Sequence, residues 1–259
     1  MSTKKLQDKK GIVIYNYNSP TVNYSAMAEK CISQCRLYCP DIPIAVIGDK
    51  VDTADLNISY PCPSNIHNIQ GAKVWYNLAR SSVYDLTPFE TTVVIDSDYM
   101  VFDDCLMSLF DSNQPVLVHK NYFNVLHCES TNLQVGTSYL PMLWATVLKF
   151  EKPDEDVQQM FSAWKQVIKN YRYYAVMWRL NRKMIRNDHA LTIALAQTLD
   201  FGPNDHCVIP YDIVTCPQDM TVEHINTDHI VMKDQHGKCK ITQSCHILNK
   251  ESLVHAITG

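Results

Sequence analysis

The chain has 259 residues, of which 46% are hydrophobic and 19% are charged, and its formal net charge is −4. This length and composition are typical of one folded domain with a substantial core, and they exclude an extensively disordered chain. The net charge gives no overall attraction to nucleic acid or to an anionic membrane, although a local basic patch could bind either.

The start of the chain, MSTKKLQDKK, is polar and basic and lacks the apolar stretch of a signal peptide. No run approaches the roughly 18 apolar residues that span a bilayer. We therefore expect a cytoplasmic protein with no membrane partner, whose ten cysteines are thiols. Cys31, Cys35 and Cys39 recur at helical spacing, which favours a buried stripe over a metal site.

The first elements predict a β-α-β unit. Gly11–Tyr15 is a short apolar, β-branched run that reads as a buried strand. A helix over Tyr24–Tyr38 is stopped by Pro40, and Ile42–Ile47 forms a second buried strand, closed by Gly48. This succession favours a parallel sheet.

A third strand carries the most informative polar residues. Ala72–Tyr84 has helical spacing, and Thr91–Ile95 is a strand that leads directly into Asp96-Ser97-Asp98. Ligands of open α/β sheets bind outside the carboxyl ends of the strands. The ends of the first and third strands should therefore face one pocket.

The second half alternates further strands and helices. In chain order we expect a strand at Pro115–His119, an apolar stretch at Leu140–Phe150, helices at Asp154–Asn170 and Ala190–Leu199, a hairpin joining Ile230–Met232 to Lys240–Thr242, and a short terminal helix. Asn187 or Asp188 is the expected cap of the second of these helices. No internal repeat or flexible linker interrupts the chain.

Asp96 and Asp98 have the chemistry of a divalent-metal site. Closely spaced carboxylates suit a hard cation such as Mn²⁺ or Mg²⁺, which could neutralise a departing nucleoside diphosphate. An Asp-x-Asp by itself usually marks a solvated turn. Its position directly after the apolar run TTVVI favours the metal interpretation.

The segment GAKVWYNLARSSVYDLTPFETTVVIDSD, after a first strand that ends in Tyr, resembles the nucleotide-binding half of the GT-A-fold glycosyltransferases. The resemblance implies one domain with a Rossmann-like mixed α/β sheet flanked by helices. Its nucleotide-sugar-binding half would span about residues 11–110 and its acceptor-binding half about 111–259. The implied activity is metal-dependent hexosyl or pentosyl transfer from a nucleotide-sugar donor to a hydroxyl acceptor.

The same resemblance implies roles for individual residues. His246, in HILNK, would complete the metal site with Asp96 and Asp98, and Lys250 would face the diphosphate. Tyr15 and Asn16 stand where family members hold the nucleobase. Core packing is the alternative for Tyr15.

Three further residues are candidates beside the pocket. Lys73 and Arg80 could supply a cation to the donor diphosphate, although exposed helix charges are usually only solvated. Asp188, in Arg186-Asn187-Asp188-His189, resembles the acidic residue that contacts the donor sugar or the acceptor hydroxyl. As a general base Asp188 would favour inversion, whereas a sugar-binding role would fit retention.

The acceptor is suggested by Tyr171–Arg186, which interleaves aromatic and basic residues. Such a segment can hold phosphates and stack on bases or sugars, and it makes the chain similar to phage-encoded enzymes that glycosylate hydroxymethylated bases in DNA. In that case the enzyme would work in the host cytoplasm. The alternatives are a glycosyltransferase that acts on a saccharide or protein, a nucleotidyltransferase, and a non-catalytic nucleotide-sugar-binding module. The segment itself has a simpler explanation, a helix with buried Tyr and exposed Arg that binds no acceptor.

Overall fold

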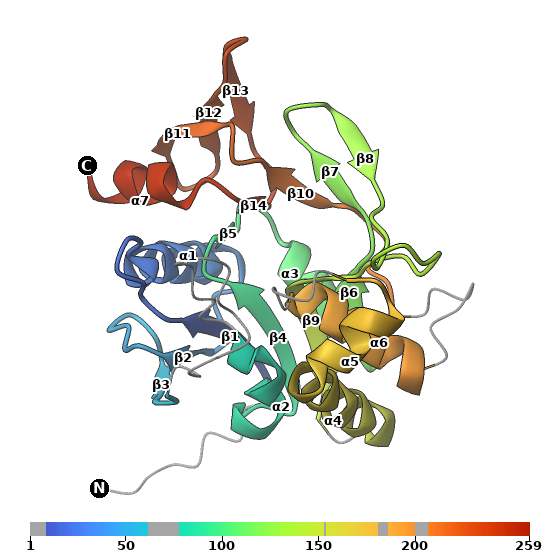
Figure 1. Ribbon diagram of the computed structural model, residues 1–259. Coiled ribbons are helices and arrows are strands. Elements are labelled where there is room, and N and C mark those ends of the chain that lie inside the picture. Colours follow the sequence, from blue (N-terminus) through green and yellow to red (C-terminus); the bar gives the residue numbers. More distant parts are fainter. Residues whose placement is uncertain (1–8, 62–77, 153, 181–185, 200–206) are drawn as a thin grey trace, which may run out of the picture.

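The computed structural model describes residues 9–61, 78–152, 154–180, 186–199 and 207–259. Its main element is a six-stranded mixed sheet in the order β3-β2-β1-β4-β9-β6 (Figure 1). The strands of this sheet are β3 (Leu56–Ile58), β2 (Ile44–Gly48), β1 (Lys10–Asn16), β4 (Thr91–Asp96), β9 (Trp144–Glu151) and β6 (Val116–His119). The predicted mixed α/β sheet flanked by helices is confirmed.

The four strands from β3 to β4 are parallel, and β9 is antiparallel to both β4 and β6. Ile12, Val13 and Ile14 of β1 are fully buried. A parallel strand covered by helices on both faces needs apolar side chains on both faces, which explains the uninterrupted run IVIY. The sheet includes strands from both sides of residue 110, because β9 and β6 follow β4 in the chain.

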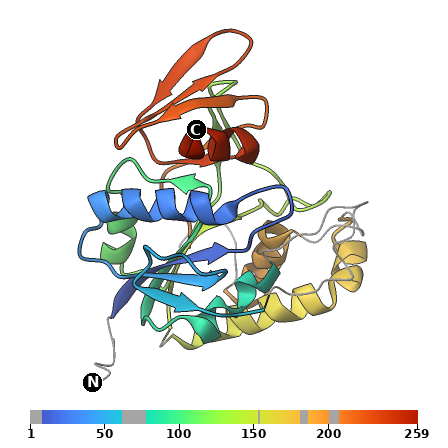
Figure 2. The same ribbon diagram turned by 90° about the vertical axis from the view of Figure 1, so that its left-hand side faces the viewer.

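Helices cover the main sheet on both sides, with α1 on one face and α4 on the other (Figure 2). The helical elements are α1 (Tyr24–Tyr38), the 3-10 turn η1 (Leu78–Ser82), α2 (Val83–Leu86), α3 (Cys105–Asp111), α4 (Glu155–Lys169), α5 (Tyr171–Met177), α6 (Asn187–Thr198) and α7 (Lys250–Thr258). None of the helices in the described ranges combines the length and the apolar character needed to cross a membrane.

Two smaller sheets lie beyond the carboxyl edge of the main one. The second has the order β5-β14-β10-β7-β8, and the third is an antiparallel sheet of β11, β12 and β13 at the top of Figure 1. Their strands are β5 (Tyr99–Met100), β14 (Cys245–Ile247), β10 (Ile213–Cys216), β7 (Tyr122–Asn124), β8 (Glu129–Thr131), β11 (Thr221–Ile225), β12 (Ile230–Lys233) and β13 (Lys238–Ile241). Helix α7 packs against both α1 and β11, so the end of the chain returns to its beginning.

Side-chain caps explain where two of the predicted helices begin. Helix α1 begins after Asn23, whose side chain accepts a hydrogen bond from the Ala26 amide at 3.1 Å. Helix α4 begins after Asp154, whose side chain accepts from the Val157 amide at 3.0 Å. A side-chain acceptor at this position satisfies an amide that has no partner within the helix.

The predicted cap of α6 is wrong. Asn187 and Asp188 lie inside the first turn, and Arg186 occupies the cap position without a capping side-chain bond. The Asp188 side chain does not cap the helix, because its Oδ1 accepts a hydrogen bond from the Ala145 amide of β9 at 2.9 Å. The described part of the predicted Ala72–Tyr84 helix consists of η1 and the start of α2, and residues 72–77 lie outside the described ranges.

The cysteine stripe on α1 is confirmed. Cys31, Cys35 and Cys39 are free thiols with no exposed surface. Desolvation raises the pKa of the Cys39 thiol to about 12. A buried neutral thiol packs as a small apolar side chain, which is the role that the spacing predicts.

Candidate functional site

The polar ends of β1 and β4 meet at one edge of the main sheet. In the parallel register Tyr15 of β1 pairs with Asp96 of β4, and Asn16 pairs with Gly48 at the end of β2. The apolar residues before them hold the strands in the core. The polar residues therefore emerge together where the strands end, as the strand pattern predicts.

The structure brings Asp96, Asp98 and His246 into one cluster. Each offers a ligand atom, and these atoms all lie within 4.8 Å of one another. His246 arrives from a distant part of the sequence, because β14 pairs with β5 and sets His246 opposite Tyr99. The Ile247 amide also donates to the Asp98 carbonyl at 3.0 Å, which fixes the two segments side by side.

The Asp98 carboxylate lies next to two nitrogen-containing side chains, Lys250 and His246. Lys250 Nζ donates to its Oδ2, and His246 Nε2 lies 3.5 Å from the same oxygen. Burial by itself would raise the pKa of Asp98, but the neighbouring Lys250 and His246 outweigh it and hold this pKa well below its usual range. The Asp98 carboxylate is therefore ionised and able to bind a cation.

Asp96 has a different environment. Its Oδ1 forms an ion pair with Arg80 Nη1, and Arg80 is only 1% exposed. Arg80 Nη2 also donates to the Thr146 carbonyl of β9 at 3.0 Å. Burial and the nearby Asp98 charge raise the pKa of Asp96, while Arg80 opposes that rise.

The donor set suits a divalent metal ion. Two carboxylates and one imidazole are ligands that Mn²⁺ accepts, and Mg²⁺ binds the carboxylates. His246 Nδ1 is buried and has no hydrogen-bond partner among the described residues. The other ring nitrogen, Nε2, lies 3.5 Å from Asp98 Oδ2 and is the one that a metal ion at this cluster would use.

Asn16 is held in place beside this cluster. Its Nδ2 donates to Ser25 Oγ and to the Asp49 carbonyl, both at 3.0 Å. The Asn16 side chain is fully buried, and its Oδ1 has no hydrogen-bond partner among the described residues. Tyr15 is 5% exposed, and desolvation raises its pKa well above the usual range, so its ring is mostly part of the core.

Asp188 lies near the start of β9. Besides the bond from Ala145, its Oδ2 pairs with Arg186 Nη2 at 3.0 Å. Ala145 precedes Thr146, whose carbonyl binds the arginine that pairs with Asp96. Asp188 is thus connected through adjacent backbone groups to the Asp96 side of the cluster.

The remaining predicted positions divide into two groups. Lys73 lies outside the described residues, as do residues 181–185 of the Tyr171–Arg186 segment. Arg80 was expected beside a diphosphate, but the structure places its guanidinium behind Asp96 with almost no exposed surface. In the described part of the segment, Tyr171 is buried and Arg172 is exposed, as expected for an amphipathic helix.

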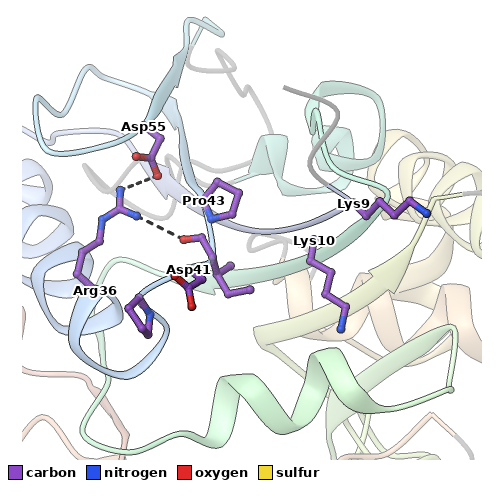
Figure 3. Close-up of a pocket in the computed structure, with 8 residues that line it drawn as sticks. Lys9, Lys10, Arg36, Asp41, Pro43 and Asp55 are labelled. Atoms are coloured by element: carbon purple, nitrogen blue, oxygen red, sulfur yellow. Dashed lines mark hydrogen bonds and ion pairs between the residues drawn. The ribbon is translucent and has the colours of Figure 1, made fainter. Parts of the chain in front are cut away.

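A shallow hollow of about 620 Å³ lies at the opposite edge of the main sheet (Figure 3). It is lined by the start of β1 and by residues just before β2. Arg36 crosses it and is already paired, with Nη2 2.5 Å from Asp55 Oδ2 and Nη1 donating to the Ile42 carbonyl at 3.4 Å. This hollow shares no residue with the cluster of carboxylates.

The sequence interpretation missed the residues that support the site. Asp49 Oδ2 accepts the Asn18 amide at 2.7 Å, and Ser25 accepts from both Asn16 and Asn18. The only sequence signal for Asp49 is its place after Gly48, which was interpreted as the end of a strand. Asp103, which accepts from the amide and hydroxyl of Ser244 at 3.0 and 2.6 Å, carried no signal at all.

The sequence matches no protein-family model and no curated protein. Solved structures similar to the chain include the bifunctional glycosyltransferase WbbM (TM-score 0.44, 18% identity, covering 64% of this chain and 35% of that one). GlyE from Streptococcus pneumoniae TIGR4 has a TM-score of 0.46 and 12% identity over 74% of this chain and 44% of its own. The galactosyltransferase LgtC has a TM-score of 0.44 and 15% identity over 71% and 70%. The chain therefore spans less than half the length of WbbM and of GlyE, and at these identities its activity has to be argued from its own site.

Proposed function

We propose that this chain is a divalent-metal-dependent glycosyltransferase that moves a hexosyl or pentosyl group from a nucleotide-sugar to a hydroxyl acceptor. The observation that carries the proposal is the cluster of Asp96, Asp98 and His246 at the carboxyl end of β4. These residues come from two distant segments, and each offers a metal-ligating atom. A chance solvated Asp-x-Asp turn would not require a buried histidine from another strand.

In this proposal Asp98 and His246 would hold Mn²⁺ or Mg²⁺, and Asp96 would hold the ion with them or orient water beside it. When bound, the metal would neutralise the charge that develops on the departing diphosphate. Arg80 positions Asp96, because its guanidinium is bonded on one side to that carboxylate and on the other to the Thr146 carbonyl.

Lys250 has two proposed tasks. Its ammonium compensates the charge of Asp98, and its side chain remains 30% exposed, so it can also donate to a phosphate oxygen. Burial opposes its positive charge, but the Asp98 carboxylate outweighs burial and raises the pKa of Lys250 above its ordinary value. Lys250 therefore carries its charge throughout the range in which proteins work.

The nucleoside would lie at the end of β1. Asn16 Oδ1 is the atom proposed to accept from an N–H or O–H of the nucleoside, because its amide nitrogen is already used by Ser25 and Asp49, and its burial requires neighbouring side chains to move when the nucleoside binds. Tyr15 would contribute the edge of a mostly buried ring. Lys73 stays a predicted diphosphate contact.

Asp188 is the proposed residue beside the reacting sugar. Its two bonds to the Ala145 amide and to Arg186 fix the carboxylate and still leave lone pairs for a sugar hydroxyl. It would act as a general base in an inverting transfer or as a sugar ligand in a retaining one. The anomeric configuration of the product decides between these roles.

The proposal specifies only that the acceptor carries a hydroxyl group. A hydroxymethylated base in phage DNA remains one prediction, which rests only on the interleaved aromatic and basic residues of the Tyr171–Arg186 sequence. A saccharide or a protein hydroxyl is the alternative. Transfer assays with the three classes of acceptor distinguish them.

The decisive experiment measures thermal stability and donor turnover with a panel of nucleotide-sugars and nucleoside triphosphates, in Mn²⁺, Mg²⁺ or EDTA. A ligand present at about 100 times its Kd stabilises the folded state by about 2.7 kcal/mol, which is easily seen as a higher Tm. We expect this shift with one nucleotide-sugar plus metal and its loss in EDTA. Stabilisation by a triphosphate alone would favour nucleotidyl transfer, and donor binding without turnover would favour a binding module.

The matched variants are Asp98→Asn and, as a control, Asp111→Asn, whose side chain is 75% exposed on α3. Asp98→Asn should weaken Mn²⁺ binding more than tenfold and abolish turnover, because it removes the ionised ligand while keeping its shape. Asp111→Asn should change neither. A folded Asp98→Asn protein with wild-type metal affinity and turnover would refute the proposal.

A further inference from the structure

Apolar side chains gather on the exposed face of α5. Tyr173, Val176 and Met177 are 63%, 55% and 59% exposed. Positions 173, 176 and 177 share one face of a helix, so the three side chains form a continuous patch. An exposed apolar patch of this kind usually marks a contact surface.

A turn from another part of the chain extends this patch. Gly136 has φ +59°, and a side chain there would meet the Trp178 carbonyl, so the turn that contains it is packed against the end of α5. Tyr139 of the same turn is 96% exposed, the largest exposed fraction among the large apolar side chains of the described residues. The turn that carries Tyr139 therefore lies against the end of α5 at Trp178.

The surroundings of the patch are basic. Lys169, Arg172 and Arg179 are exposed around it, and the sequence between Asp156 and Asp188 contains no Asp or Glu. Lys165 in the same stretch is paired with Asp85. Lys169, Arg172 and Arg179 form a local positive rim in a protein whose net charge is negative, so the rim attracts an anionic partner.

The exposed side chains fit lipid better than nucleic acid. A stacking surface for bases needs exposed aromatic faces, but Tyr171 is 2% exposed, and Tyr174 and Trp178 are partly buried against the core. Val176 and Met177 have no ring to stack. Aliphatic side chains next to a tyrosine and a basic rim are typical of helices that lie in a membrane interface.

We propose that the α5 patch (Tyr139, Tyr173, Val176 and Met177 with the rim of Lys169, Arg172 and Arg179) docks the protein on an anionic lipid surface. The apolar side chains enter the boundary between headgroups and acyl chains, and the basic rim contacts lipid phosphates. This departs from the expectation of no membrane partner. In Figure 1, α5 lies beside α4 and α6, far from the three-stranded sheet.

Co-sedimentation with vesicles of phosphatidylcholine, with and without phosphatidylglycerol, tests the proposal on the full chain. The wild-type protein should bind the vesicles that contain phosphatidylglycerol, and binding should weaken as salt screens the surface charge. Combined Tyr173→Ser, Val176→Ser and Met177→Ser should reduce binding more than tenfold. Lys169→Gln with Arg172→Gln should reduce it by about fivefold for each charge removed.

Matched controls separate this patch from general effects. Leu37→Ser removes a side chain that is 56% exposed on α1, and Lys233→Gln with Lys240→Gln removes two exposed charges from the β12–β13 hairpin. Circular dichroism verifies that each variant is folded. Failure of the wild-type protein to bind the anionic vesicles, or equal losses in the control variants, would overturn the proposal. It would also be overturned if the patch variants weakened binding to duplex DNA but not to vesicles.

Discussion

Two carboxylates only two positions apart behave differently because their neighbours differ. Asp98 lies beside Lys250 and His246, which keep it ionised despite burial. Asp96 is paired with the buried Arg80, yet burial and the Asp98 charge still raise its pKa. The pKa values of these two carboxylates are therefore set by their tertiary neighbours, Lys250 and His246 from the end of the chain and Arg80 from 16 positions before Asp96.

Replacing Arg80 by Met should destabilise the protein by about 3 kcal/mol. The change leaves Asp96 poorly solvated without its cation, and removing one member of a buried pair costs more than the pair itself contributes. Equilibrium unfolding in urea measures this loss. The double variant Arg80→Met/Asp96→Asn should recover part of the stability, and equal losses in the single and double variants would contradict the pairing.

Asp103 should make stability depend on pH below the ordinary carboxyl range. Burial opposes its charge, but hydrogen bonds from Cys105 and Ser244 outweigh this and lower its pKa in the folded state. A carboxyl with a lowered folded pKa contributes stability that is complete above its unfolded value, about 4, and is lost as the pH falls through the folded value.

The expected result is a pH-dependent difference between the wild-type protein and Asp103→Asn. The wild type should be more stable by about 1–2 kcal/mol near pH 6, which is the scale of a hydrogen bond to a charged group at a partly exposed position. This difference should shrink below about pH 4. Urea unfolding at several pH values measures it, and a difference that stays constant with pH would exclude the ionised Asp103.

At the scale of elements, the turn after β2 shapes the edge on which the nucleoside is proposed to bind. Gly48 has φ +115°, and a side chain there would meet the Asn16 carbonyl and the Tyr17 ring. The Asp49 amide also donates to that carbonyl at 2.7 Å. Only glycine allows the end of β2 to approach the end of β1 so closely.

Gly48→Ala should therefore lower the free energy of unfolding by about 2 kcal/mol or more and weaken nucleotide-sugar binding together with it. Gly237→Ala is the matched control, because Gly237 also has positive φ, +145°, but its missing side chain faces open space. The control should lose less stability and no binding. Identical binding losses in both variants would show that strain at the β1–β2 edge is not responsible.

At the scale of the whole molecule, the site depends on pairings between distant parts of the chain. Strand β4 carries Asp96 and is covered on its second edge by β9, while β5, just after Asp98, pairs with β14. A fragment of residues 1–110 would lack both partners. It would expose the backbone edge of β4 beside the buried residues Val93, Val94 and Ile95.

We expect that fragment to aggregate or remain unfolded, and to bind no metal through Asp98. Light scattering and circular dichroism measure the first two properties, and Mn²⁺ titration measures the third. The full chain is the reference for each. A soluble, cooperatively unfolding 1–110 fragment would show that the nucleotide-binding half is an independent domain and would contradict this expectation.

Much of the fold could be predicted because its signals are local. Asn23 and Pro40 bracket α1, Asp154 caps α4, and the run TTVVI is long enough to identify β4. The α6 cap was predicted wrongly because a tertiary contact, from Ala145 to Asp188, competes with the local one. Sequence patterns such as caps and apolar runs locate a helix or strand, but they do not show whether a side chain bonds within its own helix or to another part of the chain.

Periodicity and short motifs, which depend on neighbours along the chain, predict the parallel strands, the edge at which ligands should bind, and the carboxylates Asp96 and Asp98, and the family resemblance adds His246 as a candidate ligand. Tertiary contacts bring His246 and Lys250 to Asp98, bury Arg80 behind Asp96, and pack Tyr171, Tyr174 and Trp178 against the core. Lys250 and Asp98 are 152 positions apart in the sequence, and even Arg80 and Asp96 are 16 positions apart. These contacts depend on sheet pairing and burial, which no local pattern encodes.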